Sequence, residues 1–299
     1  MTLDELVEKG LVTPDQTLGA LTTYKFGGRA AWYAEVGNID QLTDLISAAG
    51  RRPLFVLGRG SNVVVADEGY RGLVIRLGGE FNEVEVVEGV ATAGAGVSLP
   101  RLARVCATAE RGGLEFYVGI PGSVGGAVVM NAGGHGSDTA EWLIEATVLD
   151  TLTGRVTTEG PAALDLGYRH SRLSASDVVL DAAFRTIPRP RRDGEQIMRD
   201  VTAWRKANQP GGTFNAGSVF KNPPGDAAGR LIDSCGLKGF SVGGASVSDR
   251  HANFFVADAT ATAQDVFDLV REVRRIVGER TGVTLETEIR FVGDFGDAR

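Results

Sequence analysis

The chain is short of the residues that mark several common classes of protein. Its 299 residues include two cysteines and three histidines, whose spacings fit no metal-ligand pattern. No apolar stretch approaches the roughly twenty residues needed to span a bilayer. The acidic start, Met1-Thr-Leu-Asp-Glu, predicts no signal peptide. We therefore expect a cytoplasmic protein without a metal, in which Cys106 and Cys235 are buried, reduced thiols.

Positive charge is also in short supply. Lys and Arg number 31 against 38 Asp and Glu, which gives a net charge of −7. This balance argues against a general nucleic-acid binder, so an anionic substrate must meet a local cluster of Arg and Lys. The remaining composition, 43% hydrophobic and 23% charged, is typical of a soluble globular protein.

The common nucleotide-binding fingerprints are missing as well. Gly94-Ala95-Gly96 lacks the third glycine of G-x-G-x-x-G, and Gly236-Leu237-Lys238-Gly239 fails the spacing of a P-loop. A ligand that carries phosphates would therefore need a different scaffold.

Two glycine-rich segments are the most informative features that the chain does have. Residues 117–136 are rich in glycine, lack Asp, Glu, Lys and Arg, and contain an apolar run, so they are not a flexible linker. Residues 54–66 join two apolar runs through the loop Gly58-Arg59-Gly60-Ser61-Asn62, which can form a nest of backbone donors for an anion. The residues of this loop are also compatible with an ordinary hairpin turn. Together the two segments favour a large, flat ligand that carries phosphates.

Hydrophobic periodicity predicts a mixture of helices and strands. The expected helices are 38–50, 100–109, one after residue 194 with Ile197, Val201 and Trp204 on one face, and one capped by Thr262 with Val266, Val270, Val273 and Val277 on one face. The expected strands lie at 54–57, within 84–97, within 143–186, and at 283–291, where Glu286, Glu288 and Arg290 would share a face. The Pro- and charge-rich run 187–194 predicts a domain boundary.

Three segments carry side chains suited to chemistry. Ser218 follows a glycine, with Lys221 and Asn222 close behind it and no histidine nearby in sequence, so it is better suited to donate a proton than to attack a carbonyl. A turn serine that bonds its own backbone is the alternative. Arg169 suits a carboxylate or a phosphate; the alternative for residues 167–172 is a solvated basic turn before a strand. Glu288 fits either a functional site or an exposed strand.

These segments, taken in order, resemble the UDP-N-acetylenolpyruvoylglucosamine reductases, also called UDP-N-acetylmuramate dehydrogenases, of bacterial peptidoglycan precursor synthesis. The resemblance runs from Thr23 to Phe291 and keeps the family's order and spacing. It rests on four main motifs: Gly119–Ala127 with Asn131-Ala132-Gly133, Gly167-Tyr168-Arg169-x-Ser171, Gly217–Pro223, and Leu285-x-x-Glu288-Ile289-Arg290.

The resemblance implies an α+β fold, with a two-lobed FAD-binding module of the PCMH type followed by an α/β substrate-binding domain. The corresponding ranges are 1–75, 76–190 and 191–299. FAD would lie along the loop 58–62 and along Gly119, Pro121, Gly122, Ser123, Gly125, Gly126 and Ala127. We expect it to be held noncovalently, because Arg59 stands where covalently flavinylated relatives often carry a histidine.

The resemblance also implies the reaction and its residues. NADPH would reduce FAD and leave before UDP-N-acetylglucosamine enolpyruvate binds, in a ping-pong order. Ser218 matches the proton donor, while Arg169 and Glu288 would stabilise charge on the substrate carboxylate. Tyr168, Lys221 and Asn222 would bind substrate. Three further residues are possible partners of the diphosphate, although their charge is more typical of solvated surface residues: Lys238, Arg205 and Lys206.

Some features depart from the family or leave other functions open. The chain resembles the shorter form of the family, because it lacks room for an extra tyrosine-bearing loop between Ser171 and Ser218. His135 stands where a tyrosine is usual, and either replaces an aromatic contact near the flavin or fills space. The alternative functions are an FAD-dependent sugar or alcohol oxidase and a catalytically silent UDP-sugar-binding paralogue. Nothing in the sequence demands more than a monomer.

Overall fold

The computed structural model describes residues 1–211 and 214–296, and the chain forms two compact units. Unit 1 contains Met1–Pro14, Trp32–Arg59 and Gly72–Arg205, and unit 2 contains Asp15–Ala31, Gly60–Arg71 and the chain from Lys206 onward. Each unit is thus assembled from segments that are distant in the sequence. The division into ranges 1–75, 76–190 and 191–299 stays a prediction.

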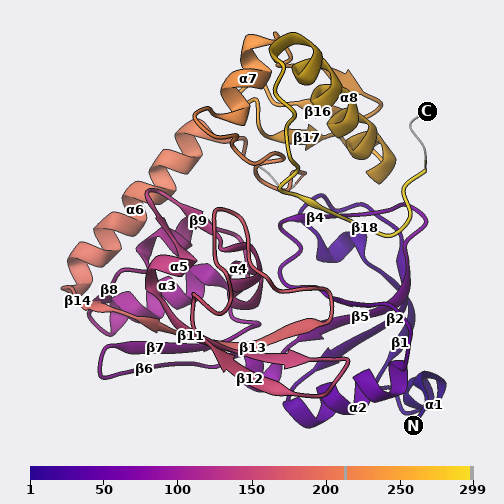
Figure 1. The fold of residues 1–299 in the computed structure, drawn as a ribbon, viewed down its shortest axis with the longest axis vertical. Coiled ribbons are helices and arrows are strands. Elements are labelled where there is room, and N and C mark those ends of the chain that lie inside the picture. The colour runs from indigo at the N-terminus through magenta and orange to yellow at the C-terminus, as the bar shows by residue number, and fades with distance from the viewer. Residues whose placement is uncertain (212–213, 297–299) are drawn as a thin grey trace. The chain divides into compact units, whose positions relative to one another are not determined.

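The main sheet of unit 1 is antiparallel and has the strand order β12-β11-β13-β7-β6 (Figure 1). Helices α3 (Leu99–Thr108) and α4 (Val124–Met130) pack against it. Alanines such as Ala91, Ala93 and Ala182 are buried in its core and leave room for close packing. The helix and strands expected in these regions are confirmed. The strands are β6 (Val84–Val87), β7 (Val90–Gly94), β11 (Leu143–Asp150), β12 (Val156–Glu159) and β13 (Asp177–Arg185).

The first part of unit 1 contains a capped helix and a short parallel strand pair. Helix α2 (Ile39–Ala49) starts at Asn38, whose Oδ1 accepts a hydrogen bond from Gln41 N at 2.9 Å, and ends at Gly50 with a φ of 60°. The predicted helix is therefore confirmed at both ends. Strand β3 (Leu54–Val56) pairs in parallel with β5 (Tyr70–Leu77), in the strand order β1 (Thr13–Thr17)-β2 (Arg29–Val36)-β5-β3.

Short elements complete unit 1. They are helices α1 (Leu3–Glu8) and α5 (Thr139–Trp142), the single 3₁₀ turns Gly79–Asn82 and Glu115–Gly119, and two small strand pairs, β8 (Arg111–Gly112) with β14 (Ile187–Pro188) and β9 (Gly133–Gly134) with β10 (Ser137–Asp138).

Helix α6 (Arg191–Asn208) begins inside the run expected to be a boundary, and its buried face differs from the predicted one. Ile197 is 37% exposed and Trp204 is 49% exposed, whereas Met198 and Val201 are buried. Both stripes have helical spacing. The apolar row through Met198 and Val201 continues to Gly194, whose missing side chain lets the helix approach Ala107 closely. This row therefore forms the buried face of the helix.

Unit 2 is built around helix α8 (Ala263–Thr281). As predicted, Thr262 caps it, with Oγ1 accepting from Asp265 N at 3.1 Å and the Asp265 carboxylate accepting from Thr262 N at 3.0 Å. The predicted valine face is buried against the antiparallel pair β15 (Ser241–Val242) and β16 (Ala245–Val247) and against β4 (Val63–Val65), and β16 also pairs antiparallel with β17 (Phe255–Ala257). Unit 2 also contains the 3₁₀ turn Gly19–Leu21 and helix α7 (Ala228–Ser234).

The last strand is shorter than predicted. Only β18 (Arg290–Val292) forms a regular strand, which pairs in parallel with β4. The residues before β18 pair instead with residues 219–221. Lys221 N donates to Glu286 O and Glu288 N donates to Val219 O, both at 2.8 Å. The change of partner interrupts the ladder, although Glu286 and Arg290 are exposed and Leu285 and Ile289 are buried as the alternation required. Among the described residues, no helix is long and apolar enough to cross a membrane.

Candidate active site

The two glycine-rich loops meet within unit 1. A Cβ atom built on Gly58 would lie 2.5 Å from Ser123 Oγ, so the first loop reaches the start of α4 so closely that a side chain has no room. Ser123 is the N-cap of α4, and its Oγ accepts from Gly126 N at 3.4 Å. The second loop is anchored to its neighbours by Val124 N, which donates to Val97 O at 2.9 Å, among other backbone bonds.

The residues around this meeting point fit a flavin dinucleotide. Gly126 and Pro121 are exposed and Gly122 is half-buried, so the second loop presents main chain with few side-chain atoms. Arg59 is exposed beside Gly58 and can supply a positive charge to a diphosphate. Gly60, with a φ of 64°, must be glycine, because a Cβ atom there would lie 2.2 Å from Leu21 O.

Arg169 lies at the tip of a tight turn in unit 1. Gly167 and His170 exchange two backbone hydrogen bonds of 3.1 Å, which leaves Tyr168 and Arg169 between them. The guanidinium donates from Nη2 to Gly133 O at 2.7 Å and lies 5.2 Å from the centre of the Tyr168 ring. Tyr168 is 54% exposed, whereas Arg169 is half-buried.

Ser218 belongs to a segment of unit 2 that a buried asparagine holds. Asn253 is 3% exposed, and its side chain both accepts from Phe220 N at 3.0 Å and donates to Phe220 O at 2.8 Å. Its main-chain oxygen accepts from Val219 N at 2.9 Å, and Ser218 forms a β-bridge with Phe254. Asn253 was not among the predicted site residues. The two phenylalanines that follow it, Phe254 and Phe255, were the available signal.

Glu288 lies next to the same segment. Its N–H donates to Val219 O at 2.8 Å, so the main chain of Glu288 is hydrogen-bonded to the residue that follows Ser218. The carbonyl of Glu288 accepts from Asn62 Nδ2 at 3.0 Å, which ties the end of the first glycine loop to this strand. Unit 2 therefore brings together three of the predicted residues, Asn62, Ser218 and Glu288.

The predicted substrate contacts of unit 2 already have protein partners. Lys221 Nζ lies 2.6 Å from Glu286 Oε1, and the side chains are 20% and 73% exposed. Asn222 Oδ1 accepts from Ala228 N at 3.0 Å, at the start of α7. Lys238, proposed as either a phosphate partner or a surface charge, forms an ion pair with Asp233 at 2.7 Å.

His135 packs against α6 within unit 1. Its ring meets the Trp204 ring edge-on, with 5.1 Å between the ring centres. Burial lowers the pKa of His135, and the positive charge of Arg205 acts in the same direction. Burial likewise lowers the pKa of Arg205. The imidazole therefore favours its neutral form beside an aromatic ring.

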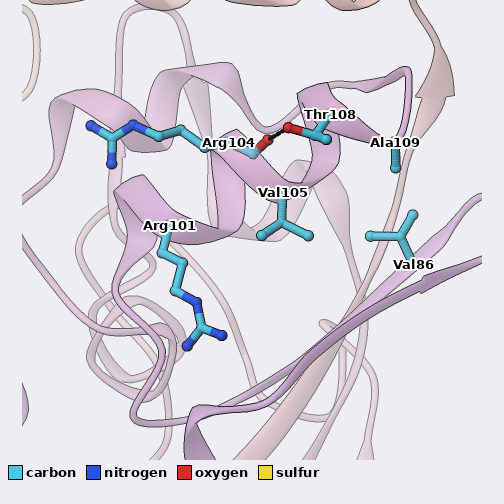
Figure 2. A pocket seen from close by; sticks show the side chains of 6 residues that line it. All are labelled: Val86, Arg101, Arg104, Val105, Thr108 and Ala109. Carbon is cyan, nitrogen blue, oxygen red and sulfur yellow. Dashed lines mark hydrogen bonds between the residues drawn. The ribbon is translucent and has the colours of Figure 1, made fainter.

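A separate hollow of about 420 Å³ opens between α3 and β6 (Figure 2). Its lining combines the apolar side chains Val86, Val105 and Ala109 with Arg101, Arg104 and Thr108. Arg101 Nη1 donates to Asn82 O at 2.6 Å, and Thr108 Oγ1 donates to Arg104 O at 2.9 Å. No residue of the predicted site lines this hollow, so it is not assigned to the reaction.

Comparison with known proteins identifies the architecture first. Residues 30–160 match the family described as an FAD binding domain, and residues 209–292 match the C-terminal domain of UDP-N-acetylenolpyruvoylglucosamine reductase. An FAD-binding domain followed by this C-terminal domain, with mixed helices and strands, is the expected class of fold. FAD is accordingly the cofactor of this protein, and the chain is of the FAD-dependent oxidoreductase class.

Full-length relatives then identify the family. The chain is 44% identical to UDP-N-acetylenolpyruvoylglucosamine reductase 2 of Symbiobacterium thermophilum over 96% of its own length and 94% of that protein. It is 42% identical to the reductase of Agathobacter rectalis, over 98% and 97% of the two chains. The crystal structure of the Thermus caldophilus reductase aligns with a TM-score of 0.81 at 39% identity, covering 93% of this chain and 97% of that one. The chain belongs to the UDP-N-acetylenolpyruvoylglucosamine reductase family.

Proposed function

We propose that this protein reduces UDP-N-acetylglucosamine enolpyruvate to UDP-N-acetylmuramate with NADPH, as a step of peptidoglycan precursor synthesis. The observation that carries the proposal is the 44% identity, over 96% of the chain, to the UDP-N-acetylenolpyruvoylglucosamine reductase 2 of Symbiobacterium thermophilum. The glycine loops that meet at Gly58 and Ser123 support it, because they fit the cofactor that the reaction needs. FAD, which the two glycine loops would hold, would supply the chemistry for hydride transfer between NADPH and the substrate's double bond.

The chain's own residues then have to stabilise the negative charge that develops on the substrate. Addition of hydride to the terminal vinyl carbon leaves negative charge on the carbon next to the carboxylate, and this charge spreads into the carboxylate oxygens. We assign Arg169 as the fixed cation for those oxygens, because a guanidinium is charged at any working pH and matches a carboxylate in shape. We assign Glu288 a hydrogen bond or a shared proton at the same carboxylate.

We assign Ser218 as the donor of the proton that the carbon receives. A serine hydroxyl is a weak acid towards water, but it suffices towards a carbanion held next to it. The bonds from Asn253 to Phe220 and Val219 restrict the main chain beside Ser218, which favours a fixed direction for the hydroxyl. Tyr168, Lys221 and Asn222 are proposed to bind the substrate, with Lys221 exchanging Glu286 for a phosphate.

We infer a monomer that works in the cytoplasm with NADPH. Both substrates are soluble nucleotides, and a chain with a net charge of −7 gains no attraction to anionic membranes. Light scattering coupled to size exclusion tests the monomer, for which a mass near 31.5 kDa is expected.

The function is tested by two anaerobic stopped-flow reactions on the FAD-loaded protein. NADPH should bleach the flavin absorbance, and UDP-N-acetylglucosamine enolpyruvate should then restore it with formation of UDP-N-acetylmuramate. No recovery with the enolpyruvyl nucleotide, together with rapid turnover of oxygen with a polyol in a separate aerobic assay, would instead identify a sugar or alcohol oxidase. A colourless protein that binds a UDP-sugar but takes up no FAD would identify a silent paralogue.

A further inference from the structure

The turn that carries Arg169 is strained. Arg169 has a φ of 52°, which is in the left-handed region that residues with a Cβ atom rarely adopt. Such a conformation costs on the order of 1 kcal/mol and persists only where neighbouring contacts enforce it. The contacts around the turn therefore indicate what holds Arg169 in place.

Asn131 supplies one of these contacts. Its Nδ2 donates to Gly167 O at 2.8 Å, at the base of the turn, while its Oδ1 accepts from Ala140 N at 2.8 Å. Nδ2 also lies 3.3 Å from Asp138 Oδ2. The residue is 2% exposed, so water cannot readily replace these partners. A donor on one side and an acceptor on the other fix the orientation of the amide.

Residues 129–133, at and just beyond the C-terminal end of α4, hold the rest of the turn. The Arg169 guanidinium donates to Gly133 O at 2.7 Å and to Asn131 O at 3.5 Å, and Ser171 Oγ donates to Val129 O at 2.7 Å. Carbonyl groups at the end of a helix favour a cation. Asn131 itself is the C-cap of α4, with φ 40° and ψ 59°. The C-cap of α4 and the start of β9 thus both supply carbonyl groups to Arg169.

We propose that Asn131 is a positioning residue of the reaction, which fixes the turn of Arg169 through its side-chain amide and so acts through the Arg169 guanidinium. The inference rests on the role of Arg169 in the proposed function. It assigns to Asn131 a task beyond capping α4, because the amide bonds to Gly167 and Ala140 lie outside that helix.

Two substitutions separate the amide from the backbone conformation. Asn131→Gly keeps access to the left-handed region and removes the amide, because glycine adopts positive φ without strain. Asn131→Asp keeps an acceptor for Ala140 N but replaces the donor that faces Gly167 O. A matched control is Thr186→Val, which also removes one side-chain hydrogen bond to a backbone carbonyl. That bond runs from Thr186 Oγ1 to Gly89 O at 2.6 Å, just after the C-terminal end of β13.

The kinetic readout is the split between the two half-reactions of the FAD-loaded protein. We expect both Asn131 variants to slow recovery with the enolpyruvyl nucleotide by about tenfold to a hundredfold, because a misplaced cation loses much of its effect on the transition state. Bleaching by NADPH should stay within about twofold of wild type, as should both reactions of Thr186→Val. In an Arg169→Lys background, Asn131→Gly should slow recovery much less, because the group through which it acts is already changed.

A second readout does not depend on activity. Hydrogen exchange of Gly167 N–H and His170 N–H, followed by mass spectrometry, should speed up in both Asn131 variants and not in Thr186→Val. Unchanged exchange, or an undiminished effect of Asn131→Gly in the Arg169→Lys background, overturns the inference. If the wild-type protein does not reduce the enolpyruvyl nucleotide, the proposed function fails, while the exchange experiment still decides whether Asn131 holds the turn.

Discussion

At the scale of single residues, Lys221, which we propose to bind substrate, already has a partner within the protein. Its ammonium group pairs with the carboxylate of Glu286 at 2.6 Å, and the Glu286 side chain is 73% exposed. Because the carboxylate of this pair faces water, the pair is worth only about 1 kcal/mol. Lys221 can therefore exchange Glu286 for a substrate phosphate at little cost.

Glu286→Gln should consequently lower KM for the enolpyruvyl nucleotide by up to about fivefold and leave kcat unchanged, because it removes a competitor for Lys221. Lys221→Met should raise KM. Steady-state kinetics measures both, with Glu279→Gln as control, since Glu279 forms a similar exposed pair with Arg275 on α8. Unchanged KM values in both Glu286→Gln and Lys221→Met would refute a role of Lys221 in binding.

His251 gives a residue-scale prediction about pH. Burial lowers the pKa of His251, with the positive charge of Lys238 adding to the effect, and its Nδ1 accepts from Asn253 N at 3.3 Å. The folded protein thus holds this proton less tightly than the unfolded chain does. The contribution of His251 to stability is complete above the unfolded pKa of about 6.5 and is lost as the pH falls through the lower folded value.

Urea unfolding of the FAD-loaded protein between pH 8 and pH 5 tests this linkage. The free energy of unfolding should fall more steeply on acidification in wild type than in His251→Asn, because Asn keeps an acceptor near the Nδ1 position but does not titrate. His135→Asn controls for the other histidine with a lowered pKa. Parallel pH profiles of wild type and His251→Asn would contradict the prediction.

At the scale of elements, a buried ion pair joins the segment before the second glycine loop to the strand before α6. Glu115 is 4% exposed; its Oε2 accepts from Gly113 N at 2.8 Å, and its Oε1 lies 2.7 Å from Arg189 Nη1. The Oε1 contact is not aligned as a hydrogen bond, so it is mainly an electrostatic attraction. Removing one partner of such a pair leaves a buried charge uncompensated.

Arg189→Met should therefore destabilise the protein by about 3 kcal/mol, the low end of the range for buried pairs, since the Arg189 side chain is 27% exposed. Adding Glu115→Gln should restore part of the loss, because a neutral amide costs less to bury. Chemical denaturation measures the differences. Arg191→Met, which breaks the exposed pair with Glu195, should change stability by less than about 0.5 kcal/mol. Absence of rescue by Glu115→Gln would contradict this account.

The elements also show what local sequence can predict. Helices α2 and α8 were predictable because their caps, Asn38 and Thr262, act within one turn. The buried face of α6 was not, because two stripes had the same spacing and only packing against Ala107 distinguished them. The start of the last strand depended on its change of partner from residues 219–221 to β4.

The site shows the same limit. Motifs predicted Ser218 and Glu288 as members of one site, and their main chains lie close together through Val219. Asn131 and Asn253 were given no role, because an asparagine in a motif does not reveal which distant carbonyl its amide will meet. Their partners, Gly167 and Phe220, are brought near by tertiary folding alone.

At the scale of the whole molecule, bound FAD should contribute to stability. Ligand binding to the folded state stabilises it by about 2.7 kcal/mol at a hundredfold excess over Kd. Removal of FAD should therefore lower Tm, and added FAD should restore it. Gly58→Ala should weaken this recovery, because the new Cβ atom would collide with Ser123 Oγ, whereas Gly160→Ala, with its nearest neighbour at 3.4 Å, should recover as wild type does. Equal recovery of both variants would argue against FAD at this loop.

The central claim is that Ser218 donates a proton to a substrate reduced by bound flavin, and stopped-flow analysis of Ser218→Ala tests it most directly. NADPH should bleach the flavin of the variant at the wild-type rate. Formation of UDP-N-acetylmuramate should then be slower by about a hundredfold or more, the usual contribution of a general acid. Product formation at the wild-type rate would contradict the account.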